Sequence, residues 1–169
     1  MGCNVDNDVF LRDIQADDLP IFFEQQLDAT ANFMAAFTAK EPGDKDAFKA
    51  HWEKIINKET IIKKTIIYHG KVAGHVSSFE QFGEQEVSYW IGRQYWGQGV
   101  ATKALFQFLD YINVRPLYAR AAKDNTASIR VLQKCGFKII SEDKGFSNSR
   151  SEEVEEYILK LSSLQAIAD

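Results

Sequence analysis

The chain has 169 residues, 45% of them hydrophobic, which suffices for one compact domain (residues 1–169) with a sizeable core. Its 20 Lys and Arg against 24 Asp and Glu give a formal net charge of −4, which argues against binding along the phosphate backbone of nucleic acid. The two cysteines, Cys3 and Cys135, form neither a disulfide framework nor a metal-ligand spacing, so we expect no metal.

The composition also bears on location. The N-terminal residues lack the basic stretch and apolar run of a secretory leader, and no apolar run approaches the roughly 18 residues of a membrane-spanning helix. Met1, Gly2 and Cys3 start like an N-myristoylation motif, but Asp6 stands where that motif has Ser or Thr. We expect a cytoplasmic protein, monomer or homodimer, with no membrane or nucleic-acid partner.

The first third of the chain predicts one strand followed by helices. Residues 9–14 are strand-like, and residues 17–27 predict a helix that starts with acidic residues and has Pro20 in its first turn. Apolar side chains at helical spacing predict a second helix over residues 44–57. Residues 28–44 mix apolar and polar side chains and end in a turn, which leaves a loop and an irregular helix both open.

Three strands follow. Residues 60–69 and 71–79 are rich in β-branched and aromatic residues, and Gly70 between them indicates a hairpin. Residues 86–92 alternate, which predicts a strand with two different faces. Those faces are formed by Val87, Tyr89 and Ile91, and by Glu86, Ser88 and Trp90.

A glycine turn, QYWGQGVAT, opens the next helix. Gly97 and Gly99 let the backbone turn without Cβ clashes, so successive N–H groups can converge at the positive end of the helix and bind phosphate. Such a turn is also common chain punctuation. A dinucleotide-binding fingerprint would need a third glycine at Thr102 and an acidic residue at Lys123, and a nucleotide-hydrolase loop would need Gly-Lys before Ser or Thr. Both classes are excluded.

The rest of the chain continues the alternation of helices and strands. The helix opened by the turn has an apolar face as far as about residue 113. A strand, a helix stopped by Gly136 and two strands follow, over residues 116–123, 125–135, 137–143 and 153–161. The predicted order is β-α-α-β-β-β-α-β-α-β-β.

Three sequence blocks fall on successive predicted elements: EVSYWIG (residues 86–92), YWGQGVAT (95–102) and NTASIRVLQKCGF (125–137). In this order they resemble the GCN5-related N-acetyltransferase (GNAT) superfamily, and within it the ribosomal-protein alanine acetyltransferase-like branch. The detailed resemblance covers about residues 70–140. Residues 28–44 match no such pattern, although they lie where the family recognises its acceptor.

The resemblance implies an α/β (α+β) fold with a mixed, strongly twisted sheet of six to seven strands flanked by about four helices. The fourth and fifth strands would splay apart around acetyl-CoA, the acetyl donor. Amides of the glycine turn would bind its pyrophosphate, and the open edge of the fourth strand would pair with its pantetheine arm. The cofactor-binding residues so implied are Tyr89, Trp90, Ile91, Gln94, Trp96, Gly97, Gln98, Gly99, Val100, Ala101, Thr102, Asn125 and Ser128.

The resemblance also identifies candidates for proton transfer to the leaving thiolate. Many family members carry a tyrosine as general acid where this sequence has Leu132. In the branch resembled here, Ser128 is placed to donate to the thiolate, although it could also be a plain helix residue. Tyr89 and Tyr118 are alternative acids, but strand tyrosines more often serve packing. Cys135 reads as a small buried hydrophobe rather than a nucleophile.

A general base is needed because an amine with a pKa of about 8 at a chain terminus, or about 10.4 on lysine, is protonated at neutral pH. The resemblance implies Glu86, since the superfamily often holds a carboxylate near the thioester end of the fourth strand. His75 has a suitable ordinary pKa, but a lone strand histidine is usually structural. Glu80 and Asp28 are candidates for orienting a cationic acceptor.

The resemblance therefore implies an enzyme, an acetyl-CoA-dependent N-acetyltransferase. It would transfer the acetyl group to a primary amine, on a protein N-terminus or a small molecule, by direct attack in a ternary complex. The alternative, suggested by Leu132, is a catalytically inactive acetyl-CoA-binding module. The acidic residues of the segment 28–44 and the negative net charge favour a cationic acceptor.

Overall fold

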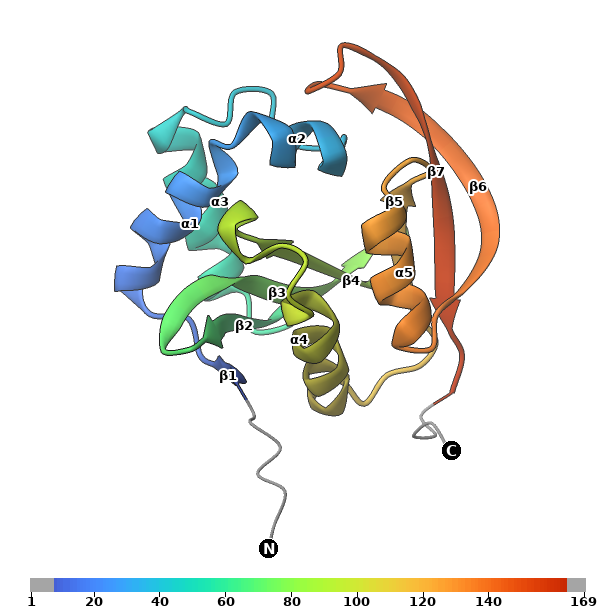
Figure 1. Ribbon diagram of the computed structural model, residues 1–169, viewed down its shortest axis with the longest axis horizontal. Helices are drawn as coiled ribbons and strands as arrows, with labels where there is room; N and C mark the ends of the chain where they lie inside the picture. Colours follow the sequence, from blue (N-terminus) through green and yellow to red (C-terminus); the bar gives the residue numbers. More distant parts are fainter. Residues whose placement is uncertain (1–7, 164–169) are drawn as a thin grey trace, which may run out of the picture.

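The computed structural model describes residues 8–163, which form one seven-stranded sheet with helices against both faces (Figure 1). The strands are β1 (Val9–Arg12), β2 (Ile62–Tyr68), β3 (Lys71–Gln81), β4 (Glu84–Ile91), β5 (Leu117–Ala122), β6 (Lys138–Ser147) and β7 (Glu152–Leu161). The α-helices are α1 (Leu19–Gln26), α2 (Ala29–Ala35), α3 (Lys45–Asn57), α4 (Val100–Phe108) and α5 (Thr126–Lys134). Short 3₁₀ turns are η1 (Ala16–Asp18), η2 (Arg93–Tyr95) and η3 (Leu109–Tyr111). None of the helices in this part of the chain has the length and apolar character needed to cross a membrane.

The sheet is mixed, with strand order β1-β2-β3-β4-β5-β7-β6. Neighbouring strands are antiparallel except β4 and β5, which run parallel. β3 and β4 pair continuously between Gly74–Ile91 and Gln81–Glu84, whereas β4 and β5 share the single pair Glu86–Tyr118. The expected splay of the fourth and fifth strands is therefore confirmed.

The two faces of the sheet are covered by different helices. The main core lies under α4 and α5, and on the opposite face Phe22 of α1 and Trp52 of α3 pack their rings against His75 of β3. The alternation predicted for the fourth strand is confirmed, because its apolar side chains belong to the main core. Buried residues of that core from β4, α4 and α5 include Val87, Ile91, Leu105 and Leu132.

The element order agrees with the sequence prediction except in residues 28–44, where the chain forms the additional helix α2. Asp28 caps this helix by accepting the N–H of Ala31 at 2.8 Å. The helix ends at Ala36, whose φ of 64° leaves the helical region. The local cap, not an apolar period, defines this element.

Two predicted boundaries were wrong. The last-but-one strand was predicted to end at residue 143 but continues to Ser147, because β6 is an exposed edge strand without the apolar alternation of a half-buried one. The helix predicted to about residue 113 ends at Phe108 and continues as η3. Cys3 and the residues of the N-myristoylation comparison lie outside the described residues.

Candidate active site

The edge of β4 that faces β5 is open beyond their one shared pair. The N–H of Gly92 donates to the carbonyl of Ala73 on β3 at 2.8 Å. Because backbone groups alternate sides along a strand, those of Tyr89 and Ile91 point the other way, toward β5. The Trp96 indole donates to the Ile91 carbonyl at 2.9 Å and ties the turn to the strand end. The other backbone groups of this edge are turned toward the opening between β4 and β5.

The glycine turn begins α4. Gly97 and Gly99 have φ values of 75° and 78°, in the left-handed region that favours glycine. A Cβ on either would meet no atom within 4 Å, so the space beside both is open. No side chain caps the helix, because its N-cap residue is Gly99. The neighbouring Gln98 amide donates to the Gln94 carbonyl at 3.0 Å. The first turn of α4 can therefore offer N–H groups and a positive dipole end to an anion.

The remaining residues predicted on these two elements have mainly packing roles in the structure. Val100 is buried in the core and anchors the start of α4, while Ala101 and Thr102 are half-buried in its first turn. Trp90 pairs with His75, so its backbone groups face β3. The buried Nε1 of Trp90 has no hydrogen-bond partner among the described residues.

The N-terminus of α5 forms the other side of the opening. Asn125 is its N-cap and accepts the N–H of Ser128 at 3.3 Å. The same side chain donates to the carbonyl of Met34 in α2 at 3.2 Å. Asn125 therefore fixes the start of α5 and joins it to the segment whose sequence matched no pattern.

A side-chain hydrogen bond spans the two arms of the opening. The Tyr89 hydroxyl of β4 lies 2.8 Å from the Ser128 Oγ of α5, although the residues are 39 positions apart. Burial raises the pKa of Tyr89 to about 12, despite the opposing effect of the bond to Ser128. Tyr89 therefore keeps its proton throughout the physiological pH range.

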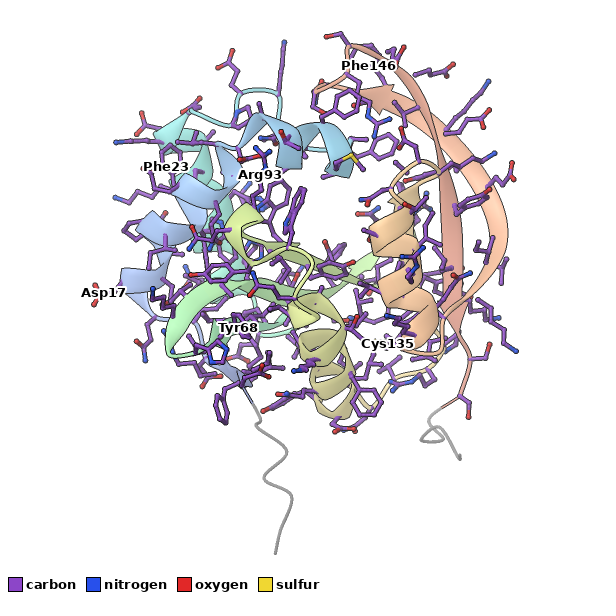
Figure 2. The ribbon with its side chains drawn as sticks, viewed as in Figure 1. Asp17, Phe23, Tyr68, Arg93, Cys135 and Phe146 are labelled. Atoms are coloured by element: carbon purple, nitrogen blue, oxygen red, sulfur yellow. The ribbon has the colours of Figure 1, made fainter. Side chains whose placement is uncertain are left out.

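At position 132, where many family members carry the tyrosine that acts as general acid, this chain has a side chain that cannot donate a proton. Leu132 is 2% exposed and belongs to the core. Cys135, at the end of α5 (Figure 2), is buried, and burial raises the pKa of its thiol to about 11, which suits a packing residue. Tyr118 lies on β5 with the Lys160 ammonium 5.8 Å from its ring centroid. Within residues 8–163, no three His, Cys, Asp or Glu side chains gather in an arrangement that could hold a metal ion.

Glu86 occupies the opposite face of β4 and is 5% exposed. Its Oε2 lies 3.5 Å from the Nε of Arg120 on β5. Desolvation by burial raises the pKa of Glu86, and the Arg120 charge offsets this only in part. Arg120 also contacts Glu156 at 2.7 Å and Asp143 at 3.1 Å, so one cation stands among three carboxylates. No local sequence motif indicated Arg120, whose contacts depend on the pairing of distant strands.

His75 is a packing residue. Its ring centroid lies 4.7 Å from that of Phe22 and 4.8 Å from that of Trp52. Burial lowers the pKa of His75 to about 3, so its imidazole is a weak base. Glu80, by contrast, is exposed near the end of β3.

The acidic residues of the segment 28–44 are partly committed to structure. Asp28 caps α2 and forms an ion pair with Arg93 at 3.4 Å, on the turn after β4 (Figure 2). Asp44 caps α3 by accepting the N–H of Ala47 at 3.0 Å. These local structural roles explain Asp28 and Asp44 without any contact to an acetyl-accepting amine.

The tip of the β6–β7 hairpin reaches α2 (Figure 1). Arg150 is nearly enclosed, with a side chain 5% exposed, and binds the Asp124 carboxylate with both terminal nitrogens at 2.6 and 2.9 Å. Its Nε donates to the carbonyl of Phe33 at 2.8 Å. Arg150 therefore connects the hairpin tip, α2 and the loop before Asn125, a junction that no local sequence signal predicted.

The fold and this site, with an open strand edge, an uncapped glycine turn and a capped helix around one opening, define a GNAT-type acetyltransferase domain. The chain belongs to this family, because the family model described as acetyltransferase (GNAT) domain matches residues 8–138.

Individual relatives agree with this family. An uncharacterized N-acetyltransferase p20 from Bacillus licheniformis is 26% identical over 86 residues, 48% of each chain, so the chain matches about half the length of this curated relative. Mycobacterium smegmatis RimJ in complex with CoA-disulfide has a TM-score of 0.76 at 16% identity, covering 92% of this chain and 82% of that one. Spermidine N-acetyltransferase from Vibrio cholerae in complex with CoA and spermine has a TM-score of 0.74 at 19% identity, covering 91% and 96%. The two structures share the fold.

Proposed function

We propose that the protein is an N-acetyltransferase that transfers the acetyl group of acetyl-CoA to a primary amine. The observation that carries this proposal is the single pair between β4 and β5, which leaves a strand edge open beside the uncapped first turn of α4. An open edge suits an extended amide-bearing arm, and a helix N-terminus suits a pyrophosphate. Family membership and the CoA named for two of the similar structures support the same donor.

In this proposal the pyrophosphate binds the glycine turn, the pantetheine arm lies along β4, and the thioester lies near the start of α5. Trp96 and Val100 would contribute mainly by holding the turn in place, because both are engaged in the protein itself. The proposed donor-binding residues are Tyr89, Trp90, Ile91, Gln94, Trp96, Gly97, Gln98, Gly99, Val100, Ala101, Thr102, Asn125 and Ser128. Of these, Trp90 would contribute only indirectly, because its backbone groups face β3 and not the opening.

The amine attacks the thioester carbonyl directly, within a ternary complex. Glu86 first accepts a proton from the bound ammonium, which frees the lone pair that attacks the thioester carbonyl. The nitrogen loses its second proton to solvent once the C–N bond has formed, and backbone N–H groups of the β4 edge stabilise the oxyanion. As the intermediate collapses, the C–S bond breaks with its electron pair on sulfur, and the Ser128 hydroxyl donates a hydrogen bond to the thiolate. The thiolate, with a pKa near the 8.5 of a cysteine, then takes a proton from solvent.

The acceptor belongs to the class of primary amines, on a protein N-terminus or a small molecule. The surplus of carboxylates around Arg120 favours an acceptor that arrives as a cation. The formal net charge of −4 acts in the same direction. Spermine, named for the Vibrio cholerae enzyme, is one cationic amine to include among the acceptors tested.

The test is thiol release from acetyl-CoA by the purified protein with amino acids, peptides, polyamines and aminoglycosides. We expect release that depends on one class of amine. The second candidate function, an inactive acetyl-CoA-binding module, is favoured by Leu132 in the usual acid position and predicts binding of acetyl-CoA without release. No binding of acetyl-CoA at all would contradict both functions.

A further inference from the structure

We propose that Tyr89 is a positioning residue that orients the Ser128 hydroxyl toward the thioester sulfur of acetyl-CoA. This inference rests on the proposed function of the opening between β4 and β5. Tyr89 would not touch the reacting atoms through its hydroxyl. It would act through Ser128, to which it is joined across the site.

The geometry brings the two hydroxyls together. The Tyr89 hydroxyl and the Ser128 Oγ are 2.8 Å apart, the length of a good O–H···O hydrogen bond. Leu132, one helical turn after Ser128 on α5, is buried and brings no polar atom to the site. Ser128 is therefore the hydroxyl that α5 holds near the arm of β4, and Tyr89 is its side-chain partner.

The relative acidity of the two hydroxyl groups determines which of them donates the hydrogen bond. A phenol, with an ordinary pKa of about 10, is a stronger donor and a weaker acceptor than the alcohol of a serine. Tyr89 therefore donates and Ser128 accepts, which leaves the hydrogen of Ser128 directed away from Tyr89. Ser128 is the third residue of α5, and the residue four positions earlier, Asp124, precedes the helix. The back-bond to a helical carbonyl that a serine deeper in a helix can form is therefore not offered to Ser128.

The acidity of Tyr89 argues against a second role, as the proton donor itself. Burial raises its pKa to about 12, well above the roughly 8.5 of a thiol, so transfer of its proton to the thiolate is uphill. The phenol stays protonated and the hydrogen bond persists over the working pH range. Tyr89 therefore contributes by orienting the Ser128 hydroxyl, and this contribution does not change with pH over that range.

The experiment is a double-mutant cycle on kcat with Y89F, S128A and the double variant. We expect each single variant to lower kcat about tenfold, since each removes the same oriented hydrogen bond, and the double variant to be no slower than S128A. The KM for acetyl-CoA should stay within about twofold of the wild type. Losses that multiply in the double variant, or full activity in Y89F, would overturn the proposal.

Two further readouts separate positioning from other roles. Y157F removes a phenol from β7 that packs against the same core, and it should leave kcat unchanged. The pH profile of kcat should keep its shape in Y89F, whereas loss of an alkaline limb would identify Tyr89 as the acid and refute positioning. If the wild type binds acetyl-CoA but releases no thiol with any amine, the proposed function itself fails, a result distinct from an additive cycle.

Discussion

Glu86 combines two properties that a general base needs. It is buried, which raises the pKa of its carboxyl above the ordinary value, and the neighbouring charge of Arg120 opposes that rise in part. A surface glutamate would have a lower pKa and would be a weaker base. In the proposed mechanism, the pair with Arg120 would adjust the basicity of Glu86.

For Glu86→Gln we expect kcat at pH 7 to fall about a hundredfold, a typical contribution of a general base. The wild-type rate should itself fall as the pH drops through the raised pKa of Glu86, because the protonated carboxyl cannot accept a proton. The deficit of the variant should shrink as the pH approaches the amine's pKa, about 10.4 for a lysine-like acceptor. A wild-type to variant ratio that stays constant from pH 6 to pH 10 would remove Glu86 from this role.

The sequence identified those site residues that lie within local sequence motifs. Ser128 and Asn125 were identified through the resemblance of the block NTASIRVLQKCGF to the family, and the structure places both at the start of α5, with Asn125 as its N-cap. The contact from Tyr89 to Ser128 and the clustering around Arg120 could not be predicted. Both depend on strand register and side-chain direction between segments that are distant in the chain.

Among the secondary-structure elements, β1, the start of α1 and β2 are joined by one buried carboxylate. Asp18 accepts hydrogen bonds from Arg12 at 2.7 and 2.8 Å, from the Gln15 N–H at 2.8 Å and from Thr65 at 2.7 Å. Desolvation by burial raises the pKa of Asp18, but these hydrogen bonds outweigh it and lower the pKa overall. Ionised Asp18 therefore stabilises the fold.

We expect Asp18→Asn to lower the free energy of unfolding at pH 7 by about 3 kcal/mol, because it leaves Arg12 without its charged partner. Because the folded pKa is lowered, this stabilisation is complete above the unfolded value of about 3.9 and is lost as the pH falls through the folded value. Urea unfolding at pH 7 and pH 2.5 measures both. Asp17→Asn, at the exposed neighbour in Figure 2, is the matched control and should have little effect. Equal losses from the two variants at pH 7 would contradict this account.

The hairpin tip, α2 and the loop before α5 form a second junction, at Arg150. We expect Arg150→Ala to release α2, so that amide hydrogen exchange accelerates in residues 29–35 while β2 and β3 keep their protection. Because Asp124 directly precedes Asn125, we expect the variant also to loosen the start of α5, near which the thioester is proposed to lie. The KM for the acceptor should therefore rise. Lys144→Ala, at an exposed lysine of β6, is the control. Unchanged exchange in α2 would show that the junction does not hold the helix.

Element prediction succeeded where periodicity is strong and failed where it is absent. The alternation of β4 and the apolar face of α4 were sufficient to place both elements. α2 is held by an Asp28 cap and by distant contacts from Arg150, which no window of local sequence contains. β6 is exposed along most of its length and has no buried face to impose a pattern.

In the whole molecule, the proposed donor site and the contacts between distant segments draw on different kinds of information. The donor side consists of three consecutive motifs on β4, α4 and α5, so sequence alone could indicate it. By contrast, α2, the β6–β7 tip and the cluster at Arg120 are brought together by contacts between segments that are in some cases more than one hundred positions apart. The proposed donor site could therefore be predicted from the sequence, whereas this tertiary arrangement could not.

The central claim is that the glycine turn holds the pyrophosphate of acetyl-CoA, and calorimetric titration of Gly99→Val against Gly83→Val tests it. Both glycines have a φ of 78° and open space around a new Cβ, so both variants carry a similar backbone cost of about 1–2 kcal/mol. Gly83 lies in the β3–β4 turn, and Gly99 precedes α4. If the turn holds the pyrophosphate, Gly83→Val binds acetyl-CoA like the wild type, while Gly99→Val, folded to the same extent, shows no binding. Equal affinity in the two variants would contradict it.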